Sequence, residues 1–252
     1  MSALKNLILN GVLFRDESEL RELVRKWDSY SGVYSKIYGV RYTRKHLETL
    51  GGKLLPAVGG ICLDAGCGSG VMFQMIGERI RPAQLYAADW SPGMLEEAKI
   101  EATRLQYTCE TRFRCIDLTK PLVWPDNFFD AVVSNQVISF LPHGWKEPLR
   151  ELRRVLKQNG YLYLGTFLRG WAYSGFAMWK HAPAILKDPI GSARVLKYRH
   201  FAVEIDKELK KYGAEFPPRE ELIDFLESLG FREIKVSKTY FGYGLALRAR
   251  CC

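Results

Sequence analysis

The sequence is poor in the residues that build metal sites and disulfide frameworks. Its 252 residues include only six cysteines and four histidines. No two cysteines form a Cys-x-x-Cys pair, and the histidines do not stand at zinc-finger spacing. The sequence therefore predicts no structural metal and a reducing compartment. Cys62 and Cys115 are expected to be small buried apolar residues.

A long apolar run is also missing. No stretch approaches the roughly 18 uninterrupted apolar residues of a membrane span, and no signal-peptide pattern opens the chain. Apolar residues make up 47% and charged residues 26%, which excludes a disordered or collagen-like chain. Cys251-Cys252 lacks the full four-residue prenylation pattern. We expect a cytoplasmic protein with one large domain, either soluble or attached peripherally to a membrane.

Positive charge is in excess, with a formal net charge of +9, but the excess is unevenly placed. Residues 54–131 carry seven basic and ten acidic side chains, whereas residues 169–211 carry nine basic and four acidic ones. Aromatic residues such as Trp171 and Trp179 lie among these late cations. That mixture suits an anionic membrane surface or single-stranded nucleic acid. A merely solubilising surface is the alternative.

Apolar strand-like runs alternate with helical segments through the middle of the chain. Strands are predicted at 61–65, 84–89, 111–116, 129–134 and 161–167, and helices at 71–80, 91–107 and 145–157, the last closed by Asn159-Gly160. This alternation predicts a parallel sheet covered by helices on both faces. A helix at 220–229 and strands at 231–239 and 242–248 predict a closing antiparallel hairpin.

The first 50 residues predict helices. Apolar residues at helical spacing begin near residue 17, and Gly32 and Gly39 are expected to interrupt the pattern. Tyr30, Tyr34, Tyr38 and Tyr42 stand four residues apart and would share one helical face. This stripe is either core packing or a cover over a ligand.

A glycine-rich turn follows the first strand. Asp64 is followed by Gly66, Gly68 and Gly70, where a missing Cβ lets the backbone turn tightly and approach a ligand. The next helix offers free N–H groups at its N-terminus. The pattern is G-x-G-x-G, whereas the dinucleotide fingerprint is G-x-G-x-x-G. A nicotinamide oxidoreductase is therefore the weakest alternative.

Two further acids follow the next strands. Asp89 ends the second strand, where a carboxylate can accept both hydroxyls of a ribose. Asp117 follows the third strand and is either an acceptor for an adenine amine or a simple turn former.

Together these segments resemble the class I S-adenosylmethionine-dependent methyltransferases. The matching pieces are D-A-G-C-G-S-G at 64–70, D-W-S-P-G-M-L-E-E-A at 89–98, I-D-L at 116–118, D-N-F-F-D-A-V-V-S at 126–134, L-R-E-L-R-R-V-L-K-Q-N-G at 149–160 and Y-L-Y-L-G-T-F at 161–167. The resemblance implies a Rossmann-like α/β fold with a seven-stranded sheet. The sheet would be mostly parallel, with one antiparallel strand in a C-terminal hairpin, helices on both faces and a helical lid insertion.

The same resemblance implies S-adenosyl-L-methionine as the cofactor and assigns its contacts. The glycines would pass under the methionine part, Asp64 would face its ammonium, and Asp89 would hold the ribose. Asn135 and Gln136 would border the methyl-transfer cleft. Met94 would pack near adenine, or else belong to the core. The full expected cofactor set is Tyr30, Asp64, Gly66, Cys67, Gly68, Gly70, Asp89, Trp90, Met94, Asp117, Leu118 and Asn135.

The resemblance also divides the chain. Residues 1–55 would form a helical segment that closes over the cofactor, and residues 56–167 the cofactor-binding core. Residues 168–218 would form a helical lid for the substrate, and residues 219–252 the helix and hairpin that complete the core. Trp27-Asp28-Ser29-Tyr30 is similar to the start of quinone-biosynthesis and phospholipid N-methyltransferases.

The expected activity is methyl transfer to a small, lipophilic or aromatic acceptor. Displacement at a sulfonium needs an in-line nucleophile and a dry site, and a base only where the acceptor must lose a proton. His143 is the candidate base, with Tyr38 as a second catalytic candidate; His143 as an ordinary loop residue is the alternative. A nucleic-acid methyltransferase and a non-catalytic cofactor-binding protein are the other readings. The oligomeric state is not predicted.

Overall fold

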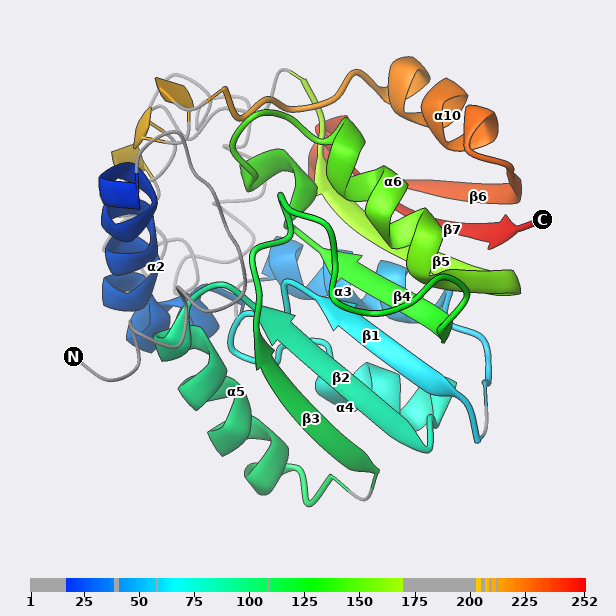
Figure 1. Cartoon of the computed structure of the whole chain (residues 1–252), viewed down its shortest axis with the longest axis horizontal. Helices are drawn as coiled ribbons and strands as arrows, with labels where there is room; N and C mark the ends of the chain where they lie inside the picture. The colour runs from blue at the N-terminus through cyan, green and yellow to red at the C-terminus, as the bar shows by residue number, and fades with distance from the viewer. Residues whose placement is uncertain are drawn as a thin grey trace.

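A seven-stranded mixed sheet forms the centre of the computed structural model (Figure 1). The structure describes residues 17–38, 41–57, 59–107, 109–169 and 213–252 and parts of 203–211. The strands are β1 (Ile61–Ala65), β2 (Gln84–Asp89), β3 (Glu110–Cys115), β4 (Phe129–Asn135), β5 (Leu156–Phe167), β6 (Phe231–Thr239) and β7 (Gly244–Cys251). Their order is β3-β2-β1-β4-β5-β7-β6. The first five pair in parallel, and β7 runs antiparallel to both neighbours. The predicted fold class is confirmed.

Helices cover both faces of the sheet. They are α2 (Glu17–Tyr38), α3 (Arg41–Gly51), α4 (Phe73–Met75), the π-turn η1 (Ile76–Ile80), α5 (Pro92–Arg104), the 3-10 turn η2 (Ile138–Phe140), α6 (Lys146–Val155), α10 (Arg219–Ser228) and the 3-10 turn η3 (Tyr240–Gly242). One core joins α6 and α10 to one face, and a second joins α3, α4 and α5 to the other.

The two cores follow from the strand geometry. Successive side chains of a strand point to opposite faces, and in β4 Val132 enters one core while Val133 enters the other. Both are fully buried. A strand covered on both faces must be apolar at nearly every position, which is why the apolar runs predicted these strands well. Cys62 is likewise fully buried, whereas Cys115 is only half-buried.

Three sequence expectations about helices are wrong. Gly32 does not interrupt α2, because it faces open space and an exposed helical glycine costs only about 1 kcal/mol. The helix expected at 71–80 is a short α4 followed by a π-turn. Asn159-Gly160 does not close a helix at 157. Instead, α6 ends at Val155, and Leu156 already pairs with Phe129.

The Asn159-Gly160 pair instead serves an irregularity within β5. The pairing shifts between Phe129 and Ala131, and Asn159 adopts φ +64°. A Cβ on Gly160 would lie 3.0 Å from the carbonyl oxygen of Asp130. The glycine is therefore required by the close approach of two strands.

No helix among the described residues is both long and apolar enough to span a membrane.

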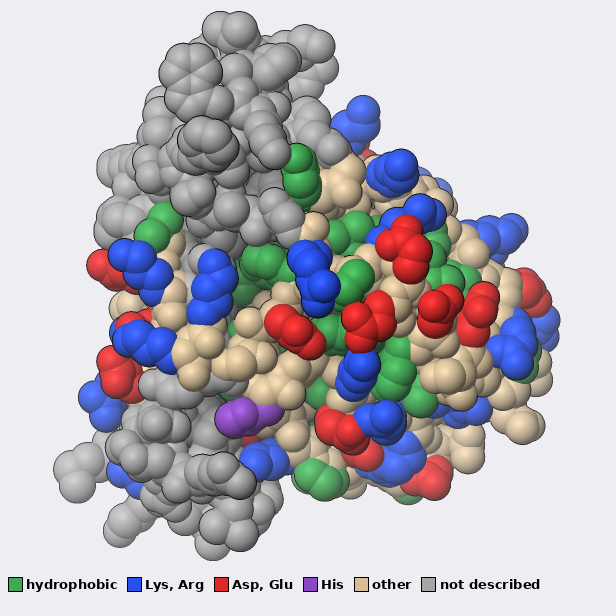
Figure 2. Space-filling view, turned by 90° about the horizontal axis from the view of Figure 1, so that it is seen from above, with side chains coloured by type: hydrophobic (Ala, Val, Ile, Leu, Met, Phe, Trp, Pro, Cys, Tyr) green, Lys and Arg blue, Asp and Glu red, His purple; other side chains and the backbone are tan. Residues whose placement is uncertain are grey.

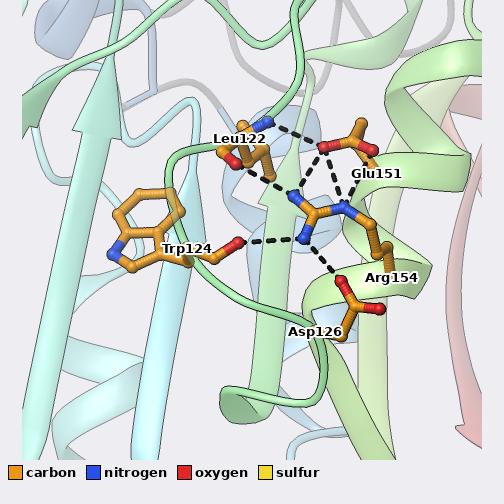
Figure 3. A network of polar contacts seen from close by, with 5 residues as sticks. All are labelled: Leu122, Trp124, Asp126, Glu151 and Arg154. Atoms are coloured by element: carbon orange, nitrogen blue, oxygen red, sulfur yellow. Dashed lines mark hydrogen bonds and ion pairs between the residues drawn. The ribbon is translucent and has the colours of Figure 1, made fainter.

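Arg154 holds the connection between β3 and β4 against α6 (Figure 3). Its guanidinium donates to the carbonyl oxygens of Leu122 (2.9 Å) and Trp124 (2.9 Å) and to the carboxylates of Asp126 and Glu151. Glu151 also accepts from the backbone N–H of Leu122 at 2.7 Å. This connection contains no helix or strand between residues 116 and 128, so its backbone groups need such side-chain partners.

We expect Arg154→Ala to lower the free energy of unfolding by about 2 kcal/mol, because two carbonyls and two carboxylates lose their shared donor. Urea unfolding at pH 7 measures the loss. Arg150→Ala on the same helix is the control, since Arg150 pairs with the exposed Glu147 and lies over the Phe225 ring. A loss no larger than that of Arg150→Ala would contradict the role of Arg154.

Candidate functional site

A cavity of about 500 Å³, solvent included, lies beyond the carboxyl ends of β1, β2 and β4. The strand order reverses here, because β1 has β2 on one side and β4 on the other, and open α/β sheets bind ligands at such a switch point. Seven residues of the expected cofactor set line the cavity: Gly66, Gly68, Asp89, Trp90, Met94, Leu118 and Asn135. The other lining residues are Trp27, Ile116, Gln136, Val137, Phe140 and Leu141.

The glycines of this loop are required both by the close packing of a neighbouring side chain and by the backbone conformation. Gly66 has φ +76°, and a Cβ there would lie 2.2 Å from a methyl group of Val137. Gly68 also has positive φ, at +52°. The backbone N–H groups of Gly66 and Cys67 both donate to the carbonyl of Ala88, at 2.8 and 2.9 Å. The loop is thereby tied to β2, and its backbone lies open to the cavity.

Two members of the expected set have packing roles in this loop. Gly70 has φ +81°, and its Cβ would meet the Phe73 ring at 2.9 Å and the Cα of Ala98 at 3.4 Å. It therefore permits contact among the loop, α4 and α5 rather than lining the cavity. Cys67 is buried, and burial raises the pKa of its thiol. It fits as a small apolar residue.

Asp89 is hydrogen-bonded directly to the glycine loop. Its Oδ2 accepts from the backbone N–H of Gly68 at 2.9 Å, and its Oδ1 accepts from the backbone N–H of Ser91 at 3.0 Å. Burial raises its pKa to about 6, although these hydrogen bonds act in the opposite direction. Each carboxylate oxygen has a second acceptor position. Asp89 can therefore accept two hydroxyl groups from a ligand in the cavity.

Asp64 is fully buried, and neither carboxylate oxygen has a partner within the described part of the chain. Burial, and then the charge of Asp89, raises its pKa to about 8. An ionised carboxylate left unpaired in such a place is costly. The site therefore favours either a proton on Asp64 or a cationic ligand group beside it.

Asp117 is a turn former whose second carboxylate oxygen is left without a partner among the described residues. Its Oδ1 accepts from the backbone N–H (2.8 Å) and the hydroxyl (2.7 Å) of Thr119, as a turn former does. Its Oδ2 is buried and has no partner among the described residues. Burial raises its pKa. The adjacent Leu118 lines the cavity.

Asp28 fastens α2 to the start of α5, a role that the sequence did not reveal. Its Oδ1 accepts from the hydroxyl of Ser91 at 2.5 Å and from the backbone N–H of Gly93 at 3.0 Å. Ser91 is itself the predicted N-cap of α5 and accepts from the N–H of Met94. The preceding residue, Trp27, lines the cavity. Asp28 therefore holds a wall of the cavity in place.

We expect Asp28→Ala to weaken the attachment of α2 by about 2 kcal/mol, because two hydrogen bonds to a charged acceptor are lost. Hydrogen exchange should become faster across α2, while β1 and β4 stay protected. Glu22→Ala is the control, since Glu22 is an exposed residue of the same helix that pairs with Lys26. Unchanged exchange in α2 of the Asp28 variant would show that the contact does not hold the helix.

His46 on α3 is a second residue that sequence reasoning missed. It is fully buried, with Nε2 2.8 Å from Asn135 Oδ1 and Nδ1 3.0 Å from Thr239 Oγ1. Burial lowers its pKa to about 4, although the bond to Asn135 opposes the shift. The ring is therefore neutral at pH 7. Since Asn135 Oδ1 is an acceptor, Nε2 carries the hydrogen and Nδ1 accepts from Thr239.

His143, the proposed base, is not brought to the cavity wall. His143 is exposed, with φ +62°, and is not a lining residue. Tyr38 ends α2, but its side chain lies outside the described residues. Tyr30 is buried beside Trp27, in the apolar cluster that contains Met94 and Phe140. Tyr30 therefore packs against residues that line the cavity but does not line it itself.

Comparison with known proteins indicates a methyltransferase domain. Residues 63–164 match the family model of a methyltransferase domain. A malonyl-[acyl-carrier protein] O-methyltransferase of Halorhodospira halophila is 34% identical over 125 residues, which are 45% of this chain and 39% of that protein. A demethylmenaquinone methyltransferase of Geobacillus kaustophilus is 23% identical over 90% of this chain and 95% of its own length.

The fold is also similar to that of solved structures. An S-adenosylmethionine-dependent methyltransferase of Thermotoga maritima, described as a possible histamine N-methyltransferase, superimposes with a TM-score of 0.60. It is 20% identical, and the match covers 90% of this chain and 99% of that one. The chain spans less than half the length of the first malonyl-[acyl-carrier protein] relatives it matches.

Proposed function

Since residues 63–164 form a class I S-adenosylmethionine-dependent methyltransferase domain, we propose that the chain transfers the cofactor's methyl group to a small, lipophilic or aromatic acceptor. One observation carries the proposal. Asp89 and the backbone of Gly68 meet at the switch point of the sheet, on a cavity whose other walls are mostly apolar. Such a site can hydrogen-bond a polar adenosyl group, and its apolar walls leave a water-poor space beside that group.

The residues present fit S-adenosylmethionine. Asp89 would accept the ribose hydroxyls, and the unpaired Oδ2 of Asp117 would accept the adenine amine. Asp64 would lie toward the methionine ammonium, a cationic group that could offset the cost of its burial. Apolar side chains of Met94 and Leu118 are placed to contact the base. Each unsatisfied acid thus has a chemical counterpart in the cofactor.

Bound S-adenosylmethionine supplies an activated methyl group on a sulfonium. The chain's own task is to bind, to orient and to exclude water. Trp27, Phe140 and Leu141 give the cavity apolar walls, and Asp28 keeps the wall on α2 closed. His143 remains the proposed base for an acceptor that must lose a proton, although it does not line the cavity, and Tyr38 remains a second catalytic candidate.

We expect Asp89→Asn to weaken binding of S-adenosylhomocysteine by at least about 30-fold, or about 2 kcal/mol, because charge-assisted bonds to the ribose are lost. Isothermal titration measures the Kd. Asp130→Asn is the matched control: Asp130 also accepts a backbone N–H, from Ile61, but at the start of β4, away from the cavity. Equal effects of the two variants, or no binding by the wild type, would contradict the proposal.

Cofactor binding should also release a proton from Asp64. With a pKa of about 8, this group is mostly protonated at pH 7 in the empty protein, and a neighbouring ammonium would lower its pKa. In the empty protein, a raised carboxyl pKa stabilises the fold at low pH, and this contribution is lost as the pH rises through 8. A bound ammonium offsets that loss. Thermal stabilisation by S-adenosylhomocysteine should therefore grow between pH 6 and pH 8.5.

Titration calorimetry in buffers of different ionisation enthalpy measures the release. We expect close to one proton at pH 7 in the wild type and a much smaller release in Asp64→Asn. An equal release from both proteins would assign the proton to another group.

The acceptor class rests on the apolar lining of the cavity. The relatives named for malonyl-[acyl-carrier protein] and demethylmenaquinone methylation support a lipophilic or carrier-borne acceptor. Contact with an anionic membrane, or with nucleic acid, would depend on the basic segment 168–218, most of which lies outside the described residues. On the face drawn in Figure 2, cationic and anionic side chains are intermixed. The ion pairs among the described residues include Arg250 with Glu233.

A further inference from the structure

A cluster of buried polar side chains at the end of β4, formed by His46, Asn135 and Gln136, takes no part in the cofactor contacts proposed above. His46 donates to Asn135 Oδ1, and this leaves Asn135 Nδ2 as the unused end of the amide. Nδ2 is buried and has no partner within the described residues, and Asn135 lines the cavity with only 6% of its surface exposed. A buried amide donor without a partner costs about 1–3 kcal/mol. The site therefore favours a ligand that supplies an acceptor.

The fold makes room for this arrangement. Gly165 stands opposite Asn135 in the register of β4 and β5. A Cβ on Gly165 would lie 2.3 Å from Asn135 Oδ1 and 2.7 Å from His46 Nε2. Any larger residue would displace the hydrogen bond. The small residue at position 165 therefore lets His46 set the direction of the Asn135 amide.

Gln136 contributes a hydrogen-bond acceptor that complements the Asn135 donor. Its backbone has φ +59° and donates to the carbonyl of Gly165 at 2.7 Å. Its Nε2 lies 3.3 Å from His46 Nε2, which carries a hydrogen and therefore accepts nothing from Gln136, while Oε1 is buried and has no partner among the described residues. Gln136 also lines the cavity and is 5% exposed. An unused donor and an unused acceptor thus stand on consecutive residues.

The surroundings decide what these two groups can bind. The next lining residues along the chain, Val137, Phe140 and Leu141, are apolar, and no lysine or arginine lines the cavity within the described residues. A carboxylate would place its charge against the Gln136 carbonyl oxygen, with no lysine or arginine side chain beside it. A hydroxyl group both accepts and donates one hydrogen bond. It matches the pair without bringing charge into the cavity.

We propose that Asn135 and Gln136 form the polar end of the acceptor site and bind an uncharged hydroxyl group of an aromatic or enolic acceptor, with His46 as the positioning residue. The hydroxyl accepts from Asn135 Nδ2 and donates to Gln136 Oε1. This assignment rests on the proposed function and specifies the acceptor of the same site. The cofactor's polar groups face the acids of β1 and β2, and the acceptor's hydroxyl faces the amides of β4.

The test compares phenol, anisole and benzoate as probes of the protein saturated with S-adenosylhomocysteine. Ligand-observed NMR titration gives the three Kd values. We expect phenol to bind at least fivefold more tightly than anisole and benzoate, because anisole cannot donate and benzoate is charged. Equal binding of anisole or benzoate, or no detectable binding of phenol, would overturn the assignment.

Variants then locate the preference. Gln136→Leu and the more isosteric Gln136→Met should each reduce the phenol preference to within twofold of anisole. The matched control is Gln84→Leu at the opposite end of β2, which should keep the preference. A retained preference in both Gln136 variants would overturn the proposal. So would a tenfold weaker Kd for S-adenosylhomocysteine in these variants, because the amides would then belong to the cofactor.

The role of His46 is tested by a pair of replacements. His46→Gln keeps a donor for Asn135 and should retain most of the phenol preference, whereas His46→Leu should lose it while the Kd for S-adenosylhomocysteine changes less than threefold. Thermal unfolding identifies any variant that fails to fold. If a His46 variant does not fold, the two Gln136 variants decide whether the amides bind the hydroxyl group. Failure of the wild type to bind S-adenosylhomocysteine would instead refute the proposed function.

Discussion

The burial of two carboxyl groups at the ends of neighbouring strands is the constraint on which the site depends. Asp64 and Asp89 lie where a charge is poorly solvated, and burial raises the pKa of both. Asp89 is partly satisfied by the loop that it organises, but Asp64 is not. A protein retains such groups where a ligand supplies the missing partners. The glycine loop, the cap of α5 and the helix α2 all surround these two acids.

Much of the fold and of the candidate site was predictable because the determining signals are local. β1 and β2 have the predicted bounds, since a strand buried on both faces requires a continuous apolar run. β6 also has the predicted bounds, although it is a largely exposed edge strand. The loop between Asp64 and Gly70 and the acid at position 89 were identified by their place after a strand. Ser91 was identified as an N-cap from its own sequence context.

The missed features depend on partners far apart in the sequence. Asp28 meets Ser91 across 63 positions, and His46 meets Thr239 across 193. No local pattern marks either contact: His46 stands beside Arg44 and Lys45, as an exposed residue would, yet it is fully buried. The end of α6 was misplaced for a similar reason, because Leu156 pairs with Phe129 in a strand. Tertiary packing decides these positions.

A crystal structure of the complex with S-adenosylhomocysteine tests the central claim most directly. The account predicts ribose hydroxyls bonded to Asp89, the ligand's ammonium against Asp64, and the sulfur facing the apolar chamber beside Phe140 and the amides of β4. A ligand bound elsewhere, or a cavity that stays closed by the protein's own side chains while Asp64 remains unpaired, would contradict it.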